Sequence, residues 1–296
     1  MTEFTTSPRT DRRNEMREIE ASLITDTVRR LCIEANCHLT NDVKERICAC
    51  HENETWPQAK EILGHIIENY KIADKQDQPV CQDTGVTCVF LNIGQDVHIC
   101  GGDLTKAVNE GVRRGYEEGY LRKSVIKDPL FDRVNTGDNT PAMIYTEIVP
   151  GDKIEVTVAP KGFGSENVSK LTMLRPSDGL EGVKNFVCKV VEEAGPNPCP
   201  PIIVGVGVGG TFDKAALLAK KALLRPLDEK NADPLYASLE DELLEKINSL
   251  GIGPQGFGGK TTALSVNIEK FATHFAGLPV AVNLNCHVAR HKTEVL

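Results

Sequence analysis

The chain has 296 residues, with 34 Lys and Arg against 42 Asp and Glu, a net charge of −8, a hydrophobic fraction of 40% and ten cysteines. This balance of charged and apolar residues excludes a chain that is disordered throughout. The negative charge argues against a protein that binds the phosphate backbone of nucleic acids. No apolar run reaches the roughly 20 residues that cross a bilayer, and the polar N-terminus lacks the apolar core of a secretory signal. We therefore expect a cytoplasmic protein whose cysteines are reduced.

The N-terminal quarter is predicted to be helical, after a flexible tail over residues 1–13. Apolar residues recur at helical spacing over residues 14–53, and the pair Asn41 and Asp42 is placed to cap a second helix. The same period continues to about residue 75. Residues 14–75 are therefore expected to form a set of packed helices.

Beyond residue 75 the pattern changes to a mixture of strands and helices, with Asp103 as a candidate N-cap. The turn residues 150–152 predict a hairpin between two adjoining strands. Because helices and strands do not alternate strictly, we expect an α+β fold in which residues 14–296 form one domain. Strands are predicted at residues 86–93, 142–149, 153–159, 201–208, 262–268 and 278–284, and helices at 103–119, 182–194, 212–224 and 234–250.

Three glycine-rich segments invite comparison with phosphate-binding loops. Residues 205–211 follow a predicted strand, but their spacing is GxGxGG rather than GxGxxG, so close packing of strand on helix is the favoured interpretation over nucleotide binding. Residues 253–261 end like a Walker A loop, yet Pro254 stands where that loop needs glycine and a β-rich run follows. Residues 161–165 follow a strand, where backbone N–H groups could approach an anion.

The cysteines separate by context into two groups. Seven lie within predicted helices or strands or at a helix end, and are interpreted as packing residues: Cys32, Cys37, Cys48, Cys50, Cys88, Cys100 and Cys188. Three lie at breaks in secondary structure, beside proline, glycine or polar residues: Cys81, Cys199 and Cys286. Three thiolates from separate loops suit an iron–sulfur cluster in which one iron lacks a protein ligand. Their separations of 118 and 87 residues carry no motif specificity, however.

Seven segments occur in one order along the chain: CQDTG (81–85), VNTGDNTPA (134–142), KGFGSEN (161–167), NPCPP (197–201), GVGVGGT (205–211), LGIGPQGFGGKTTAL (250–264) and NLNCHVARH (283–291). In these segments the chain resembles the α subunit of the two-subunit class I (iron–sulfur) fumarate hydratases, a superfamily that also includes L-tartrate dehydratase. The resemblance runs from about residue 20 to the C-terminus. It implies that Cys81, Cys199 and Cys286 hold a [4Fe–4S] cluster on loops of the mixed α/β region.

The same resemblance implies roles for further residues. Gln82 and Asp83 are expected to line the substrate site, with Asp83 as acid–base partner of the hydroxyl, whereas the residues alone favour a turn-forming Asp83. Arg122 matches a carboxylate-binding arginine, against the alternative of a solvated helix end. Gly164 matches a backbone contact to substrate. His274 is a candidate for proton handling, although a surface histidine is an equal alternative.

Lys161, Asn135 and Thr136 are additional candidates in the resembling segments. The implied reaction is the reversible hydration of fumarate to L-malate, a step of the tricarboxylic acid cycle, on a small dicarboxylate. In the family the carbon base and further carboxylate-binding residues come from a C-terminal domain, so a separate β subunit in an α2β2-type hetero-oligomer is expected. The alternatives are L-tartrate dehydratase and a non-catalytic iron–sulfur sensor. The joint presence of Gln82, Asp83 and Arg122 argues against the sensor.

Overall fold

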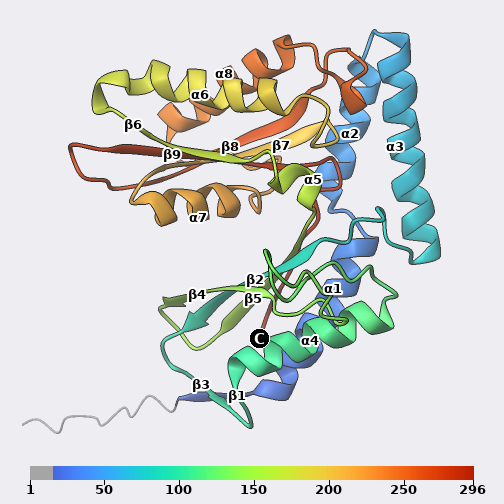
Figure 1. The fold of residues 1–296 in the computed structure, drawn as a ribbon, viewed down its shortest axis with the longest axis vertical. Helices are drawn as coiled ribbons and strands as arrows, with labels where there is room; N and C mark the ends of the chain where they lie inside the picture. Colours follow the sequence, from blue (N-terminus) through green and yellow to red (C-terminus); the bar gives the residue numbers. More distant parts are fainter. Residues whose placement is uncertain (1–15) are drawn as a thin grey trace, which may run out of the picture.

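The computed structural model describes residues 16–296, so the predicted tail over residues 1–13 lies outside the described residues. Two four-stranded sheets lie one above the other, with the helices α2 and α3 along one side of the molecule (Figure 1). Helices and strands mix without strict alternation, as the α+β prediction required. No helix in residues 16–296 combines the length and the apolar character needed to cross a membrane.

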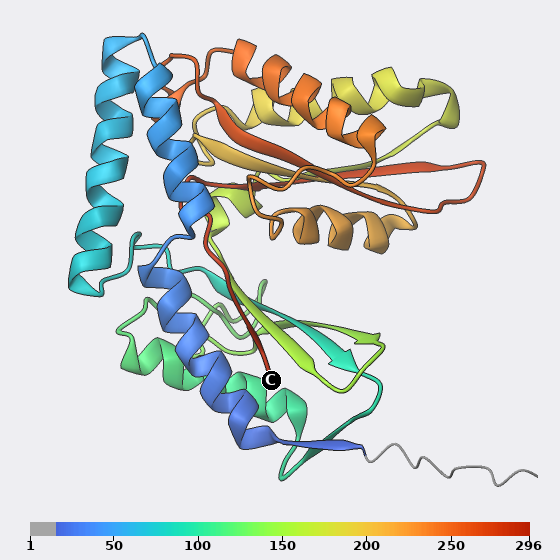
Figure 2. The same cartoon turned by 180° about the vertical axis from the view of Figure 1, so that it is seen from behind.

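The upper sheet of Figure 1 has the strand order β6-β9-β7-β8 and is covered by helices on both faces. Helices α6 and α8 lie on one face and α7 lies on the other (Figures 1 and 2). A core of buried valine, isoleucine and leucine side chains fills the space between the sheet and α6 and α8. The elements are β6 (Lys170–Leu174), α6 (Gly179–Ala194), β7 (Ile202–Gly209), α7 (Phe212–Ala222), α8 (Pro234–Ser249), β8 (Ala263–Phe271) and β9 (Leu278–Asn285).

The lower sheet has the order β10-β5-β2-β4 and packs against α1 and α4. Asp103 caps α4 as predicted, since its side chain accepts a hydrogen bond from the Lys106 amide at 2.8 Å. The short helix α5 (Phe163–Glu166) lies between the two sheets (Figure 1). The lower elements are α1 (Ala21–Cys37), β2 (Val86–Gly94), α4 (Leu104–Glu118), β4 (Met143–Val149), β5 (Ile154–Lys161) and β10 (Lys292–Val295).

The N-terminal helices form largely where the apolar period predicts them. Helix α2 (Asn41–Asn53) and helix α3 (Pro57–Gln76) follow α1, and Pro57 occupies the first turn of α3, where its missing N–H costs nothing. The prediction is wrong at Arg17–Glu20, which form strand β1 rather than helix. This strand pairs in parallel with β3 (Val97–Cys100), and its one buried side chain, Ile19, alternates with exposed neighbours.

The predicted hairpin over residues 142–159 is also wrong. Strands β4 and β5 both exist, but β2 lies between them and pairs in parallel with β4 and antiparallel with β5. The connecting turn bonds to the end of β2 instead: the Gly94 amide donates to the Lys153 carbonyl at 2.8 Å and the Asp96 amide to the Gly151 carbonyl at 3.0 Å. A local turn signal cannot reveal a strand that inserts from elsewhere in the chain.

The first glycine-rich segment packs β7 against α7, as predicted. A Cβ atom on Gly207 would lie 2.1 Å from the Ala215 carbonyl oxygen, and one on Gly205 would lie 2.2 Å from that of Ala219. Both contacts are with helix backbone, which cannot rotate away. The absence of a side chain at these two glycines therefore allows β7 and α7 to pack closely.

Replacing Gly207 with alanine is expected to lower the free energy of unfolding by about 1–3 kcal/mol or more, because the new methyl group overpacks the strand–helix interface. Chemical denaturation of the folded chain measures this change. Gly277→Ala is the control, since a Cβ there meets nothing closer than 3.9 Å. Equal losses in the two variants would contradict the packing account.

Candidate active site

The ends of neighbouring strands bring the three loop cysteines together. Cys199 comes shortly before β7 and Cys286 directly follows β9, and these strands are antiparallel neighbours in which Ile203 lies opposite Asn285. Cys81 lies in the segment just before β2, and the start of this strand lies at the end of the lower sheet nearer the upper sheet (Figure 1). Burial raises the pKa of the Cys199 thiol, and the nearby thiols of Cys286 and Cys81 raise it further. The three thiols therefore lie close enough to influence one another, although they belong to three separate loops.

Cys199 has a backbone conformation that residues other than glycine rarely adopt. Its backbone has a φ of +54°, in the left-handed region, so the surroundings must stabilise it. Gln255 does this from the adjacent loop, since its backbone N–H and its Nε2 both donate to the Pro200 carbonyl at 2.8 Å. His287 Nδ1 lies 3.0 Å from the Cys199 carbonyl oxygen. The cysteine is thereby presented outward on a rigid support.

The segment that ends like a Walker A loop is part of this support. A Cβ atom on Gly256 would lie 2.5 Å from Pro196 Cβ, so the two loops are in close contact. The far end of the segment is tied to the N-terminal helices, because the Lys260 amide donates to the buried Glu54 carboxylate at 2.8 Å. Gln255 and Glu54 could not be predicted from the sequence, because the glycine spacing is the informative feature of residues 253–261 and Glu54 belongs to a distant segment.

Positive charge surrounds the Cys286 thiol. Burial raises its pKa, while the charges of Arg290 and Lys161 act in the opposite direction. Thiolates are the form that binds metal, so these cations favour the ligating state. Within residues 16–296, no three His, Cys, Asp or Glu side chains converge as ligands of a single ion. A cubane cluster distributes its cysteines over different iron atoms, so three thiols on separate loops fit that group.

Asp83 uses both carboxylate oxygens to shape the Cys81 segment. Oδ1 accepts from the Gly85 amide at 3.0 Å and Oδ2 accepts from the Phe163 amide at 3.0 Å. The Asp83 amide in turn lies 3.4 Å from Cys81 Sγ. The turn-forming role considered for Asp83 is therefore present, and the carboxylate remains half-buried beside a candidate ligand. The neighbouring Gln82 is exposed, with Oε1 3.3 Å from Cys81 Sγ.

Gly164 and Lys161 lie at the same junction. Gly164 is exposed on α5, and a Cβ atom there would lie 3.5 Å from the Asn197 carbonyl oxygen, beside the Cys199 loop. Lys161 is buried, with Nζ 2.8 Å from Ser165 Oγ and 3.4 Å from Glu166 Oε2. Burial lowers the pKa of Lys161, which the negative charge of Glu166 opposes.

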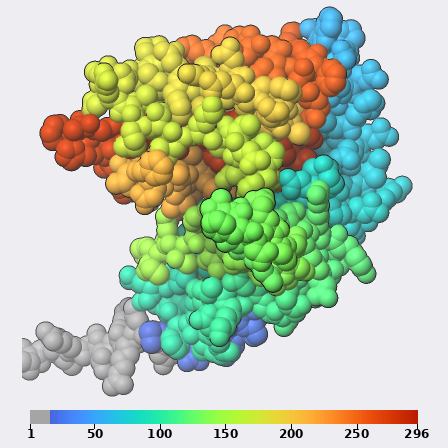
Figure 3. Space-filling model, viewed as in Figure 1, coloured from blue at the N-terminus to red at the C-terminus, as the bar shows by residue number. Residues whose placement is uncertain are grey.

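Arg122 lies at the surface in a loop that is anchored to the Cys81 segment. Its carbonyl accepts from Thr84 Oγ1 at 2.9 Å. Asn139 completes the anchor, because its buried side chain accepts from the Ser124 amide at 2.7 Å and donates to the Gly85 carbonyl at 3.2 Å. In the space-filling view this loop, in green, lies beside the teal segment that leads into β2 (Figure 3).

Asn135 and Thr136 form hydrogen bonds across the loop that contains Arg122. Asn135 Nδ2 donates to the Lys123 carbonyl at 3.0 Å, and the Thr136 amide donates to the Val125 carbonyl at 2.9 Å. The structure thus gives both residues contacts that hold the Arg122 loop together.

His274 lies far from the three loop cysteines. It is exposed in the loop between β8 and β9, at the opposite end of the sheet from the cysteines. The eight residues of β9 separate the two ends, a distance of about 25 Å at strand spacing. Its Nδ1 accepts from the Ala276 amide at 3.2 Å, which shapes the loop locally. His274 is thus a surface residue of this chain, and its role in proton handling stays a prediction.

Comparison with known proteins identifies relatives over nearly the whole chain. The family model described as fumarate hydratase (Fumerase) matches residues 25–295. The chain is 46% identical over 273 residues to the "Putative L(+)-tartrate dehydratase subunit alpha" of Methanocaldococcus jannaschii, covering 90% of this chain and 95% of that protein. It is 32% identical over 274 residues to the L(+)-tartrate dehydratase subunit alpha of Escherichia coli strain K12, covering 91% and 89%. As the sequence segments predicted, the chain belongs to the fumarate hydratase (Fumerase) family.

Proposed function

We propose that the chain is the α subunit of a [4Fe–4S]-dependent hydro-lyase that reversibly hydrates fumarate to L-malate. The convergence of Cys81, Cys199 and Cys286 where the two sheets meet carries this proposal. Membership of the fumarate hydratase family supports it. The resemblance of residues 161–167 and 258–264 to fumarate hydratases favours fumarate as substrate.

The donor set suits an iron–sulfur cluster. Three thiols from separate loops, with Arg290 and Lys161 near Cys286, match a group that is anionic once its thiolates are bound. Cys81, Cys199 and Cys286 would hold the cluster. When bound, it supplies an iron without a protein ligand, which acts as a Lewis acid towards the substrate hydroxyl.

The chain's own residues would bind the substrate and move a proton. Asp83 is held by two backbone amides with its carboxylate beside Cys81, which places it to exchange a proton with the hydroxyl that is added or removed. Arg122 has a planar fork that matches a substrate carboxylate. Its side chain is exposed on a loop anchored to the Cys81 segment. Gln82 and the Gly164 amide would fix the substrate orientation.

A β subunit is expected to complete the site. The relatives at 46% and 32% identity are named as α subunits, which supports a partner subunit. The assembly that we propose is an α2β2-type hetero-oligomer. The proton at the substrate carbon needs a base, and we assign that base and further carboxylate-binding groups to the β subunit. The isolated chain is then inactive even when it is loaded with cluster.

L(+)-tartrate is the second candidate substrate, because the names of the same relatives specify it. Tartrate carries one more hydroxyl than malate. The two substrates therefore differ in one hydrogen-bonding group, which a site built to bind it discriminates strongly.

Anaerobic co-expression with a β-type subunit, followed by assays on fumarate, malate and L(+)-tartrate, tests the proposal. We expect interconversion of fumarate and malate by the complex, none by the chain alone, and loss of activity on exposure to air. Dehydration of tartrate with no turnover of malate would overturn the fumarate assignment in favour of the second candidate. A cluster-loaded complex that turns over none of these substrates would contradict the assignment as an enzyme and would favour a non-catalytic iron–sulfur sensor.

A further inference from the structure

Arg290 lies in the segment that carries the chain from the upper sheet to the lower one. Strand β9 ends at Asn285, Cys286 follows, and β10 begins at Lys292 in the other sheet. Arg290 is only 3% exposed. Its Nη2 donates to the Asp83 carbonyl oxygen, in the segment of Cys81. One guanidinium therefore ties the Cys286 loop to the Cys81 loop.

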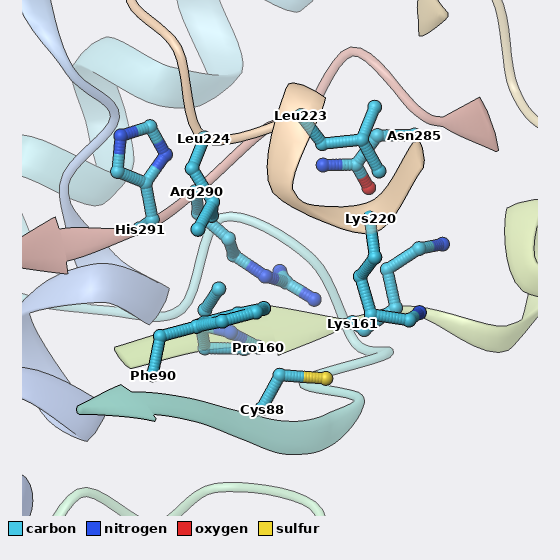
Figure 4. A pocket seen from close by; sticks show the side chains of 11 residues that line it. Cys88, Phe90, Pro160, Lys161, Lys220, Leu223, Leu224, Asn285, Arg290 and His291 are labelled. Carbon is cyan, nitrogen blue, oxygen red and sulfur yellow. The ribbon is translucent and has the colours of Figure 1, made fainter. Parts of the chain in front are cut away.

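The rest of this guanidinium has no partner within the described chain. Nε and Nη1 of Arg290 are buried, and neither donates to any atom of residues 16–296. Figure 4 shows the side chain extending among the residues of a cavity lined also by Lys161, Lys220 and Cys88. Unsatisfied buried donors are costly, and those of a charged group more so. Two such donors on one side chain point to an acceptor that the protein chain does not supply.

The charge around the cavity leads to the same conclusion. Its lining among the described residues includes three cations, Lys161, Lys220 and Arg290, and no carboxylate. Glu166 pairs with both lysines from outside the lining, at 3.4 Å to Lys161 and 2.8 Å to Lys220. Glu166 thus pairs with the two lysines, whereas no carboxylate of the described residues pairs with Arg290. Excess buried charge is costly unless an anion compensates it.

We propose that Arg290 is a positioning residue for the cluster: it fastens the Cys81 loop to the Cys286 loop and places positive charge near the Cys286 thiol. This inference rests on the proposed function, since it requires the three cysteines to hold a cluster. Partners beyond the ligands orient a metal site and adjust its affinity and potential. The planar fork explains why arginine suits this position, because one nitrogen bonds the backbone while others stay available.

Variants of Arg290 in the anaerobically reconstituted full chain test the inference. Arg290→Met, similar in length but uncharged, is expected to lose iron to a chelator about 10- to 100-fold faster than the wild-type chain. It is also expected to shift the reduction potential of the cluster to lower values, because a nearby positive charge favours the reduced form. Arg290→Lys keeps the positive charge but lacks the planar guanidinium. Its cluster should therefore have a reduction potential close to that of the wild type, but it should still lose iron faster than the wild-type chain.

Arg46→Met is the matched control, because Arg46 also donates to two backbone carbonyls, those of Leu227 at 3.0 Å and Leu264 at 3.3 Å. It should leave the iron release rate and the potential unchanged. A wild-type rate and potential in Arg290→Met would overturn the inference, as would equal effects in Arg46→Met. A wild-type chain that takes up no cluster would instead overturn the proposed function, and this inference with it.

Discussion

Serine in place of Cys199 is expected to leave the chain without its cluster and the reconstituted enzyme without activity. The hydroxyl is a poor ligand for iron compared with a thiolate, and the proposed ligand set has three cysteines. The rigid loop around Cys199 strengthens this expectation, since the left-handed backbone and the Gln255 contacts prevent another group from taking its place. Iron and acid-labile sulfide, measured after anaerobic reconstitution, report the loss.

Cys48→Ser provides the control for this substitution. Cys48 lies on α2, half-buried, with Sγ 3.2 Å from the Tyr70 hydroxyl, and a serine hydroxyl can keep that hydrogen bond. We expect this variant to keep its iron and its absorption spectrum. If Cys48→Ser and Cys199→Ser lose iron alike, the ligand assignment is wrong.

Asparagine in place of Asp83 is expected to lower kcat by about 10²- to 10⁴-fold with the cluster retained, because a positioned acid–base group contributes that much. The amide cannot exchange a proton with the substrate hydroxyl, yet it is nearly the same shape. The carboxylate of Asp83 accepts hydrogen bonds from the amides of Gly85 and Phe163 through its two oxygens. Asparagine has one side-chain oxygen, so it can accept from only one of these amides. We therefore also expect a stability loss of about 1 kcal/mol.

Activity, iron content and thermal stability measured on the same preparation separate these two effects. Asp103→Asn is the matched control, because Asp103 also bonds a backbone amide and asparagine caps helices equally well. It should retain full activity. An Asp83→Asn enzyme with wild-type kcat would restrict Asp83 to its turn-forming role.

The candidate cluster ligands could be singled out from the sequence because they stand out locally. Cys199 between prolines and Cys286 after a strand differ visibly from cysteines within an apolar helical period, such as Cys32. Their mutual proximity could not be derived from spacing, since it depends on the antiparallel pairing of β7 with β9. The family resemblance supplied that step.

Several supporting residues could not be predicted because their contacts join distant segments. Glu54 bonds the Lys260 amide, and Arg290 bonds the Asp83 carbonyl, across more than 200 residues in each case. The same limit explains the wrong hairpin at residues 142–159, where β2 separates two strands that are adjacent in sequence. Local patterns predict elements, whereas the pairing of elements decides which residues meet.

The position of His274 shows a different limit. The residue type suited proton handling, but β9 separates its loop from the cysteines by the length of the sheet. Arg122 illustrates the opposite outcome, because the bond from Thr84 to its carbonyl holds its loop beside the Cys81 segment. The family resemblance proposed Arg122 and the residue type proposed His274, and the fold places only the Arg122 loop beside the Cys81 segment.

Mössbauer spectroscopy of the anaerobically loaded wild-type chain, combined with iron and sulfide analysis, tests the central claim most directly. Three cysteine ligands predict about four iron and four sulfide per chain, with one iron distinct from the other three and altered by added malate. Four equivalent iron sites, or a chain with no bound iron, would contradict the assignment of Cys81, Cys199 and Cys286 as the ligands of a cluster with one open iron.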